Sequence, residues 1–170
     1  DLRKFEFTFR VMDRNFAVNN VSMRSSRSGY ASLSGSLLFS DAVDKKKVDK
    51  VMKAYSGKTT YPVTIESTDN PAIYHFAVND IPKGEKDLEV TIEADGKPMG
   101  IENKISQNYT IPAKDKFTFL SARQIREPEH GIEIVFSEPL SVSQDLNGLI
   151  SVQGISSLTF QITDNIVNVY

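Results

Sequence analysis

Residues 88–96 read Leu-Glu-Val-Thr-Ile-Glu-Ala-Asp-Gly, and the pattern in this short segment recurs through the whole chain. Apolar Leu88, Val90 and Ile92 alternate with polar residues. Successive side chains of a β-strand point to opposite faces of the sheet, so an alternation with period two predicts a half-buried strand. Asp95-Gly96 favours a tight hairpin turn directly after it.

The same alternation appears in ten further segments, and turn residues separate them. The predicted strands lie at 5–11, 15–18, 33–39, 63–66, 73–78, 88–92, 117–120, 132–136, 149–152, 158–162 and 166–170. Short strands that alternate with turns are typical of β-sandwiches. We therefore expect an all-β fold of tandem Ig-like β-sandwiches.

A linker at 112–115 divides the predicted strands into two domains, 1–112 and 116–170. The second block contains fewer strands than the roughly seven of a complete Ig-like domain, so we expect this sandwich to be incomplete. The chain begins with Asp1 and finishes within a strand-like pattern. We accordingly expect an excised piece of a longer protein, whose unpaired sheet edges invite association.

One segment departs from the strand pattern. Val48, Val51, Met52 and Tyr55 recur at helical spacing, and Asp41 is a suitable N-cap residue. We therefore predict one short amphipathic helix over about 42–55, laid over an end or edge of a sheet.

Composition narrows the possible functions. The 170 residues carry a net charge of −2, which provides no field to attract nucleic acid or an anionic membrane. The absence of cysteine excludes thiol catalysis, thiolate metal sites and disulfides. We find no signal peptide, and no apolar run approaches the roughly 20 residues of a membrane-spanning helix.

Residues that could carry chemistry are few and scattered. His75 lies within a predicted strand and His130 within a turn, and neither has a second ligand at metal-binding spacing. Ser34-Gly35-Ser36 lies in a strand pattern and lacks the surrounding glycines of a nucleophile elbow. We interpret both histidines and these serines as surface residues.

The remaining candidates also have simpler structural interpretations. Acidic pairs and short turn motifs lie in caps, loops and hairpins, where solvated charges and turn residues are expected. They are Asp41 with Asp44, Glu127 with Glu129, Asp13 with Asn15, Asp69 with Asn70, Asp95-Gly96-Lys97, and Arg24 and Arg27 near Tyr30. Asn20 and Asn108 match the short, unspecific glycosylation pattern. We predict no catalytic residue, no cofactor and no metal site.

The most distinctive stretch is Val-Phe-Ser-Glu-Pro-Leu at 135–140, followed by Gln-Asp-Leu-Asn-Gly-Leu-Ile at 144–150. Pro139 ends the pairing of the preceding strand, and Gly148 permits a bend. The stretch resembles the bacterial alpha-2-macroglobulin family. Residues 37–41, 74–81, 88–96 and 111–117 are similar to the preceding macroglobulin domain of that family.

This resemblance implies macroglobulin-like domains from the N-terminal region of a large protease-trapping protein. It further implies an extracytoplasmic location, in the periplasm or at the cell surface, with a membrane contact made only through a lipid anchor of the parent. The implied partners are other domains of the same parent chain and, through it, proteases. The family's Cys-Gly-Glu-Gln thioester motif is absent here, so the piece is expected to be non-catalytic scaffold.

Two other functions stay open at this stage. Tandem Ig-like domains also serve as binding modules of bacterial surface adhesins or glycan-binding proteins. The chain has six tyrosines but no tryptophan to form a sugar-binding platform. An enzyme is the weakest alternative, because the sequence contains no recognisable catalytic group.

Overall fold

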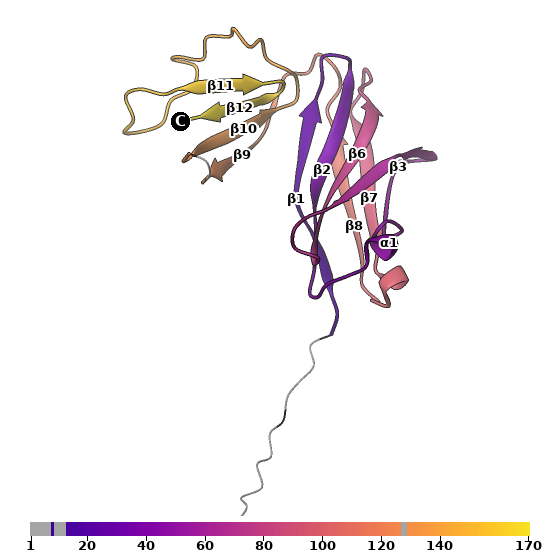
Figure 1. Ribbon diagram of the computed structural model, residues 1–170. Coiled ribbons are helices and arrows are strands. Elements are labelled where there is room, and N and C mark those ends of the chain that lie inside the picture. The colour runs from indigo at the N-terminus through magenta and orange to yellow at the C-terminus, as the bar shows by residue number, and fades with distance from the viewer. Residues whose placement is uncertain (1–7, 9–12, 127–128) are drawn as a thin grey trace, which may run out of the picture.

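The chain forms an all-β structure of three antiparallel sheets, seen in a computed structural model that describes residues 8, 13–126 and 129–170. Strands of three to ten residues pack as two sheets into a sandwich, and a third sheet lies at one end of it (Figure 1). The expected all-β, sandwich-like fold class is therefore confirmed. The strand expected at 5–11 lies outside the described residues.

The first sheet of the sandwich has the strand order β1-β2-β6-β5 and the second has the order β4-β3-β7-β8. The strands are β1 (Phe16–Ser25), β2 (Tyr30–Phe39), β3 (Met52–Ser56), β4 (Thr59–Tyr61), β5 (Val63–Ser67), β6 (Ile73–Pro82), β7 (Leu88–Asp95) and β8 (Lys104–Ile111). Inward-facing apolar side chains of these strands, with Val48, Val51, Met99 and Ile101 from the segments between them, form one core cluster of twenty-one buried residues among the described ones. The alternation of period two supplies this core, because each strand turns its apolar side inward.

The third sheet, called here the C-terminal sheet, has the order β11-β12-β10-β9. Its strands are β9 (Phe119–Ile125), β10 (Gly131–Phe136), β11 (Phe160–Thr163) and β12 (Ile166–Val169). The long connection between β10 and β11 folds back over one face and places Leu140 and Leu146 against Val167 and Val169. This core contains four buried residues, so the C-terminal sheet has far less apolar burial than the sandwich.

The predicted helix is much shorter than expected. Helix α1 spans only Lys45–Val48, is capped by the side chain of Asp44, and is followed by strand β3. Met52 and Ala54 point into the core from β3 and pair with β7, so strand pairing overrides the helical spacing of this segment. The prediction of a helix over 42–55 was therefore wrong outside Lys45–Val48, and the cap is Asp44 and not Asp41.

Three other local predictions were also wrong. Strand β6 continues through Asn79 to Pro82, four residues past the end of the strand predicted at 73–78. Asp95-Gly96 does not form a tight hairpin, because the 3-10 helix η1 (Lys97–Met99) lies in the longer connection between β7 and β8. Residues 149–152 form no strand and have only an isolated bridge between Asn147 and Ile150. No helix among the described residues is long and apolar enough to cross a membrane.

Candidate functional site: the polar joint between the sandwich and the C-terminal sheet

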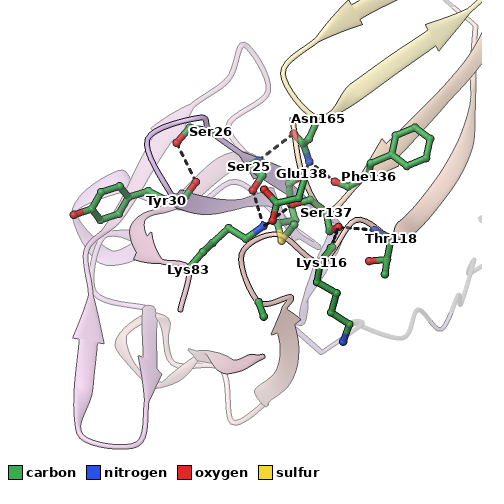
Figure 2. Close-up of polar contacts among 12 residues, drawn as sticks. Ser25, Ser26, Tyr30, Lys83, Lys116, Thr118, Phe136, Ser137, Glu138 and Asn165 are labelled. Atoms are coloured by element: carbon green, nitrogen blue, oxygen red, sulfur yellow. Dashed lines mark hydrogen bonds and ion pairs between the residues drawn. The ribbon is translucent and has the colours of Figure 1, made fainter. Parts of the chain in front are cut away.

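The most unusual site in the structure is a group of buried polar side chains where the sandwich meets the C-terminal sheet. Lys83, Ser25, Ser137 and Asn165 make up the buried polar residues found among the described part of the chain. All four meet at this one place, shown in Figure 2. We call them, with Glu138 and Arg27, the polar joint.

Lys83 is the central residue of the polar joint. It follows directly after β6, and only 1% of its side chain is exposed. Its ammonium donates to Ser25 Oγ at 3.1 Å, to the backbone oxygen of Ser137 at 2.6 Å, and to Glu138 Oε1. An ammonium group has three N–H donors, so all three have acceptors here, and two of these belong to the C-terminal sheet.

Asn165 makes the second connection. It lies in the turn between β11 and β12 and is fully buried. Its Oδ1 accepts a hydrogen bond from the Ser25 backbone N–H at 3.0 Å, whereas its Nδ2 donates to the backbone oxygens of Phe136 at 2.7 Å and Met23 at 3.3 Å. Because both amide hydrogens and the amide oxygen are used, the side chain fits in one orientation only.

A third contact lies at the edge of the joint. The Arg27 guanidinium, in the turn between β1 and β2, donates to the backbone oxygen of Leu140 at 3.0 Å. Arg27 was expected in a surface loop, and the structure gives it this bridging contact.

The linker is held on both sides of the joint. The carboxylate of Asp87 accepts hydrogen bonds from the Ala113 backbone N–H at 2.9 Å and from Lys116 Nζ at 2.8 Å. On the other side, Ser137 Oγ donates to the backbone oxygen of Lys116 at 2.5 Å and accepts from the Thr118 N–H at 2.7 Å. Hydrogen bonding to Lys116 is the main cause that lowers the pKa of Asp87, with the Ala113 N–H contributing next.

The distinctive motif at 136–140 lies at this joint. Phe136 supplies a backbone acceptor, Ser137 supplies a backbone and a side-chain acceptor, and Glu138 supplies the counterion. The sequence identified the motif, but the partners Lys83 and Asn165 were missed. Both looked like ordinary loop or turn residues, and only the packing of distant segments buries them.

A polar cleft opens beside the joint, between the outer face of the β1-β2-β6 strands and the C-terminal sheet. It has a volume of about 380 Å³, and serine hydroxyls and charged side chains provide much of its lining. The lining includes Ser22, Arg24, Ser34, Ser36, His75, Arg123 and Glu133. Arg123 and Glu133 form a bidentate ion pair at 2.7 and 3.1 Å.

The histidine and serine candidates come together only in part. Ser36 Oγ lies 3.1 Å from His75 Nδ1 on the outer face of the sandwich, and this pair is exposed. Glu66 is the residue paired with His75 across the strands, but no hydrogen bond between their side chains is observed. The pair is exposed to water, so we assign it no chemistry.

Of the other sequence candidates, Asp41, Asp44 and Asn15 line one pocket, and Arg24 and Tyr30 line another. His130 and Glu129 lie exposed next to β10, Asp44 caps α1, and Asp95 accepts from the Lys97 N–H. Glu127 lies outside the described residues. Within the described chain, no group of three or more His, Asp or Glu side chains is arranged to hold a metal ion.

The fold and the joint together define an all-β chain whose two parts are connected through buried charges. No protein-family model, curated protein or solved structure matches this chain.

Proposed function

We propose that this chain is a non-catalytic structural part of a bacterial alpha-2-macroglobulin-like, protease-trapping protein. The observation that carries the proposal is the position of the 136–140 motif. The stretch that resembles that family supplies several of the contacts that hold the C-terminal sheet against the sandwich, through Ser137, Glu138 and Leu140. A motif used in this way sets the angle between successive β units, which is what a scaffold requires.

The proposal includes an extracytoplasmic location and a longer parent chain with further domains. In such a parent, reactive chemistry and the protease-cleaved segment are supplied by other domains. This part contributes a connection that fixes the orientation of neighbouring units. A movement of one unit is therefore transmitted to the next through Lys83 and the linker.

The direct test uses the parent gene and the isolated chain together. We expect the full reading frame to encode a lipid-attachment signal upstream and many β domains downstream. Incubated with trypsin or elastase, the isolated 170-residue chain is expected to leave protease activity unchanged, whereas the full parent reduces cleavage of large substrates. Stoichiometric inhibition by the isolated chain, or a parent with a carbohydrate-active catalytic domain, would overturn the proposal.

The polar cleft supports a second candidate function, that of a tandem glycan-binding module. Serine hydroxyls and the Arg123 guanidinium are groups that hydrogen-bond to sugars. The described cleft offers one aromatic ring in its lining, that of Phe76, which is itself buried in the core. Saturation-transfer NMR with bacterial and host glycans distinguishes the two functions, because only the binding module transfers signal to a sugar.

A further inference from the structure

The connections between the sandwich and the C-terminal sheet are predominantly polar. Lys83, Asn165 and Arg27 make the side-chain hydrogen bonds that cross between the two parts. Leu120 is the one residue from the C-terminal sheet that, within the described chain, packs against the core cluster of the sandwich. Val135 and Ile166 are also buried, on the face of the C-terminal sheet opposite its own core. The interface therefore combines the buried polar groups with a few apolar side chains.

Such an interface favours two states. In the closed state each donor of the Lys83 ammonium has an acceptor, and the ammonium is shielded from water. A small separation would leave the ammonium buried without its carboxylate, which is strongly unfavourable. A full separation hydrates the ammonium, the Glu138 carboxylate and the Asn165 amide, and the apolar surface that it exposes is limited to a few side chains such as Leu120, Val135 and Ile166. Intermediate angles between the two units are therefore less stable than either the closed or the fully separated state.

The cleft beside the joint gives the C-terminal sheet room to move. Its facing walls are lined by side chains that water solvates well, including Ser34 and Ser36 on one wall and Arg123 and Glu133 on the other. Widening or narrowing this cleft changes the hydration of polar groups and leaves the two cores intact. Phe76 and Ile166 are the large apolar residues of a lining that is otherwise mostly polar, so the walls present only a small hydrophobic barrier to rotation.

The linker provides the pivot. Asp87 holds Ala113 on the side of the sandwich, and Ser137 holds Thr118 on the side of the C-terminal sheet. Between these anchors, Asp115 adopts a left-handed backbone conformation with φ of 62°. Lys116, between these anchors, bonds to Asp87 through its exposed side chain and to Ser137 through its backbone oxygen. Rotation about this short segment therefore moves the C-terminal sheet and must also shift or release the exposed contact with Asp87.

We propose that the polar joint is a two-state elbow in which Lys83 is the latch. With the latch closed, the C-terminal sheet is held at one angle. With the latch open, it swings about residues 113–118 while both units stay folded. This inference concerns the motion of the chain itself and does not depend on the proposed function.

The test measures the distance between the two units by double electron–electron resonance. The chain lacks cysteine, so spin labels at Thr64→Cys on β5 and Gln161→Cys on β11 are the only labelled sites. Both positions are exposed. We expect one narrow distance distribution in the otherwise unchanged chain. Lys83→Met keeps the length of the side chain and removes the ammonium, and we expect it to add a second, broad population.

Lys86→Met is the matched control, because Lys86 lies three residues further along and is exposed. This control is expected to keep the narrow distribution. Hydrogen exchange on the same samples checks that the strands of both units stay protected in Lys83→Met. If they do not, Glu138→Gln replaces it, since this substitution removes the counterion and keeps the size of the side chain.

Three results would overturn the proposal. The first is a Lys83→Met distribution as narrow as that of the control. The second is an equally broad distribution in all samples, because the joint would then not hold one angle. The third is loss of protection throughout the sandwich in both Lys83→Met and Glu138→Gln, because these residues would then support the fold and not the angle.

Discussion

Replacing Asn165 by alanine removes the most completely bonded side chain of the joint. The change leaves three buried groups without their partner: the Ser25 N–H and the backbone oxygens of Phe136 and Met23. An unsatisfied buried polar group costs about 1–3 kcal/mol. Taking about 1 kcal/mol for each, because water can enter the space left by the amide, gives a loss of about 3 kcal/mol.

This loss should be concentrated in the C-terminal sheet. Asn165 lies in the turn that joins β11 and β12, and the core beneath these strands has only four buried residues, against twenty-one in the sandwich. Hydrogen exchange resolved by peptide is the suitable assay. A loss of about 3 kcal/mol corresponds to roughly a hundredfold faster exchange where exchange follows the opening equilibrium. Peptides from β2 and β6 should change little.

Two further variants make the measurement decisive. Asn147→Ala is the matched control, because Asn147 is exposed and its side chain donates only to Asp145. We expect this control to change stability by no more than about 0.5 kcal/mol. In Asn165→Asp, the first carboxylate oxygen still accepts from Ser25, but the second faces two backbone oxygens. At neutral pH we therefore expect Asn165→Asp to lower the stability of the C-terminal sheet at least as much as Asn165→Ala does. On acidification we expect part of this stability to return, because the protonated carboxyl oxygen can donate a hydrogen bond.

The recovery of stability on acidification follows from the direction in which the pKa of the introduced carboxyl is expected to shift. Two facing carbonyl oxygens disfavour the ionised form, so the pKa of the introduced carboxyl should rise on folding. The destabilisation is then present above that raised pKa and falls as the pH is lowered through it. If Asn165→Ala exchanges no faster than Asn147→Ala, the polar joint does not stabilise the C-terminal sheet and the reasoning is refuted.

Three other predictions concern the sandwich, the C-terminal sheet and the linker. Leu37→Ala empties a position with 0% exposure in the sandwich and should lower the free energy of unfolding by about 2–5 kcal/mol in urea titrations, and a change below about 1 kcal/mol would contradict the core assignment. Gly131→Ala would place its Cβ 2.5 Å from the Val169 backbone oxygen, so exchange should become faster along β10 and β12 and stay unchanged in the sandwich. The pKa of Asp87 is lowered from its ordinary 3.8, so its bond to the Ala113 N–H should persist above that pH and be lost as the pH falls through the lowered value. The Ala113 amide resonance should therefore titrate below pH 3.8, and it should show no such transition in Asp87→Asn.

Strand positions were predictable wherever apolar and polar residues alternate. Leu88, Val90 and Ile92 show this pattern and lie in β7, as expected. The pattern failed at Met52 and Ala54, because a segment with helical spacing also satisfies strand alternation over a short distance. The pairing of β3 with β7 decides between the two, and pairing is a tertiary property that the local sequence does not contain.

The joint was predictable on one side only. The 136–140 motif contains a strand-ending proline next to a small polar residue and a charge, so its unusual composition indicated a special role. Lys83 and Asn165 carried no comparable signal, because lysine after a strand and asparagine in a turn are common at exposed positions. Their burial depends on contacts between segments separated by 54 and 140 residues, for Lys83 with Ser137 and for Asn165 with Ser25.

The motif also explains why a scaffold would place charged groups where two units meet. An apolar interface of the same size would hold the units together over a range of angles, since apolar contacts are non-directional. The Lys83 ammonium is satisfied only when Ser25, Ser137 and Glu138 all lie within hydrogen-bonding distance, so it defines one relative orientation.

This requirement limits stability as well as angle. Desolvation of the ammonium and the carboxylate offsets much of their attraction, so a buried ion pair adds little net stability while its loss is costly. A joint of this kind therefore holds its angle firmly and still separates without exposing a core.

A Lys83→Met, Glu138→Leu double variant tests this point, because it removes both charges together. We expect it to unfold at a urea concentration close to that of the unmodified chain while the distance between Thr64→Cys and Gln161→Cys labels loses its single narrow distribution. A double variant that keeps the narrow distribution would show that shape alone, and not charge, sets the angle.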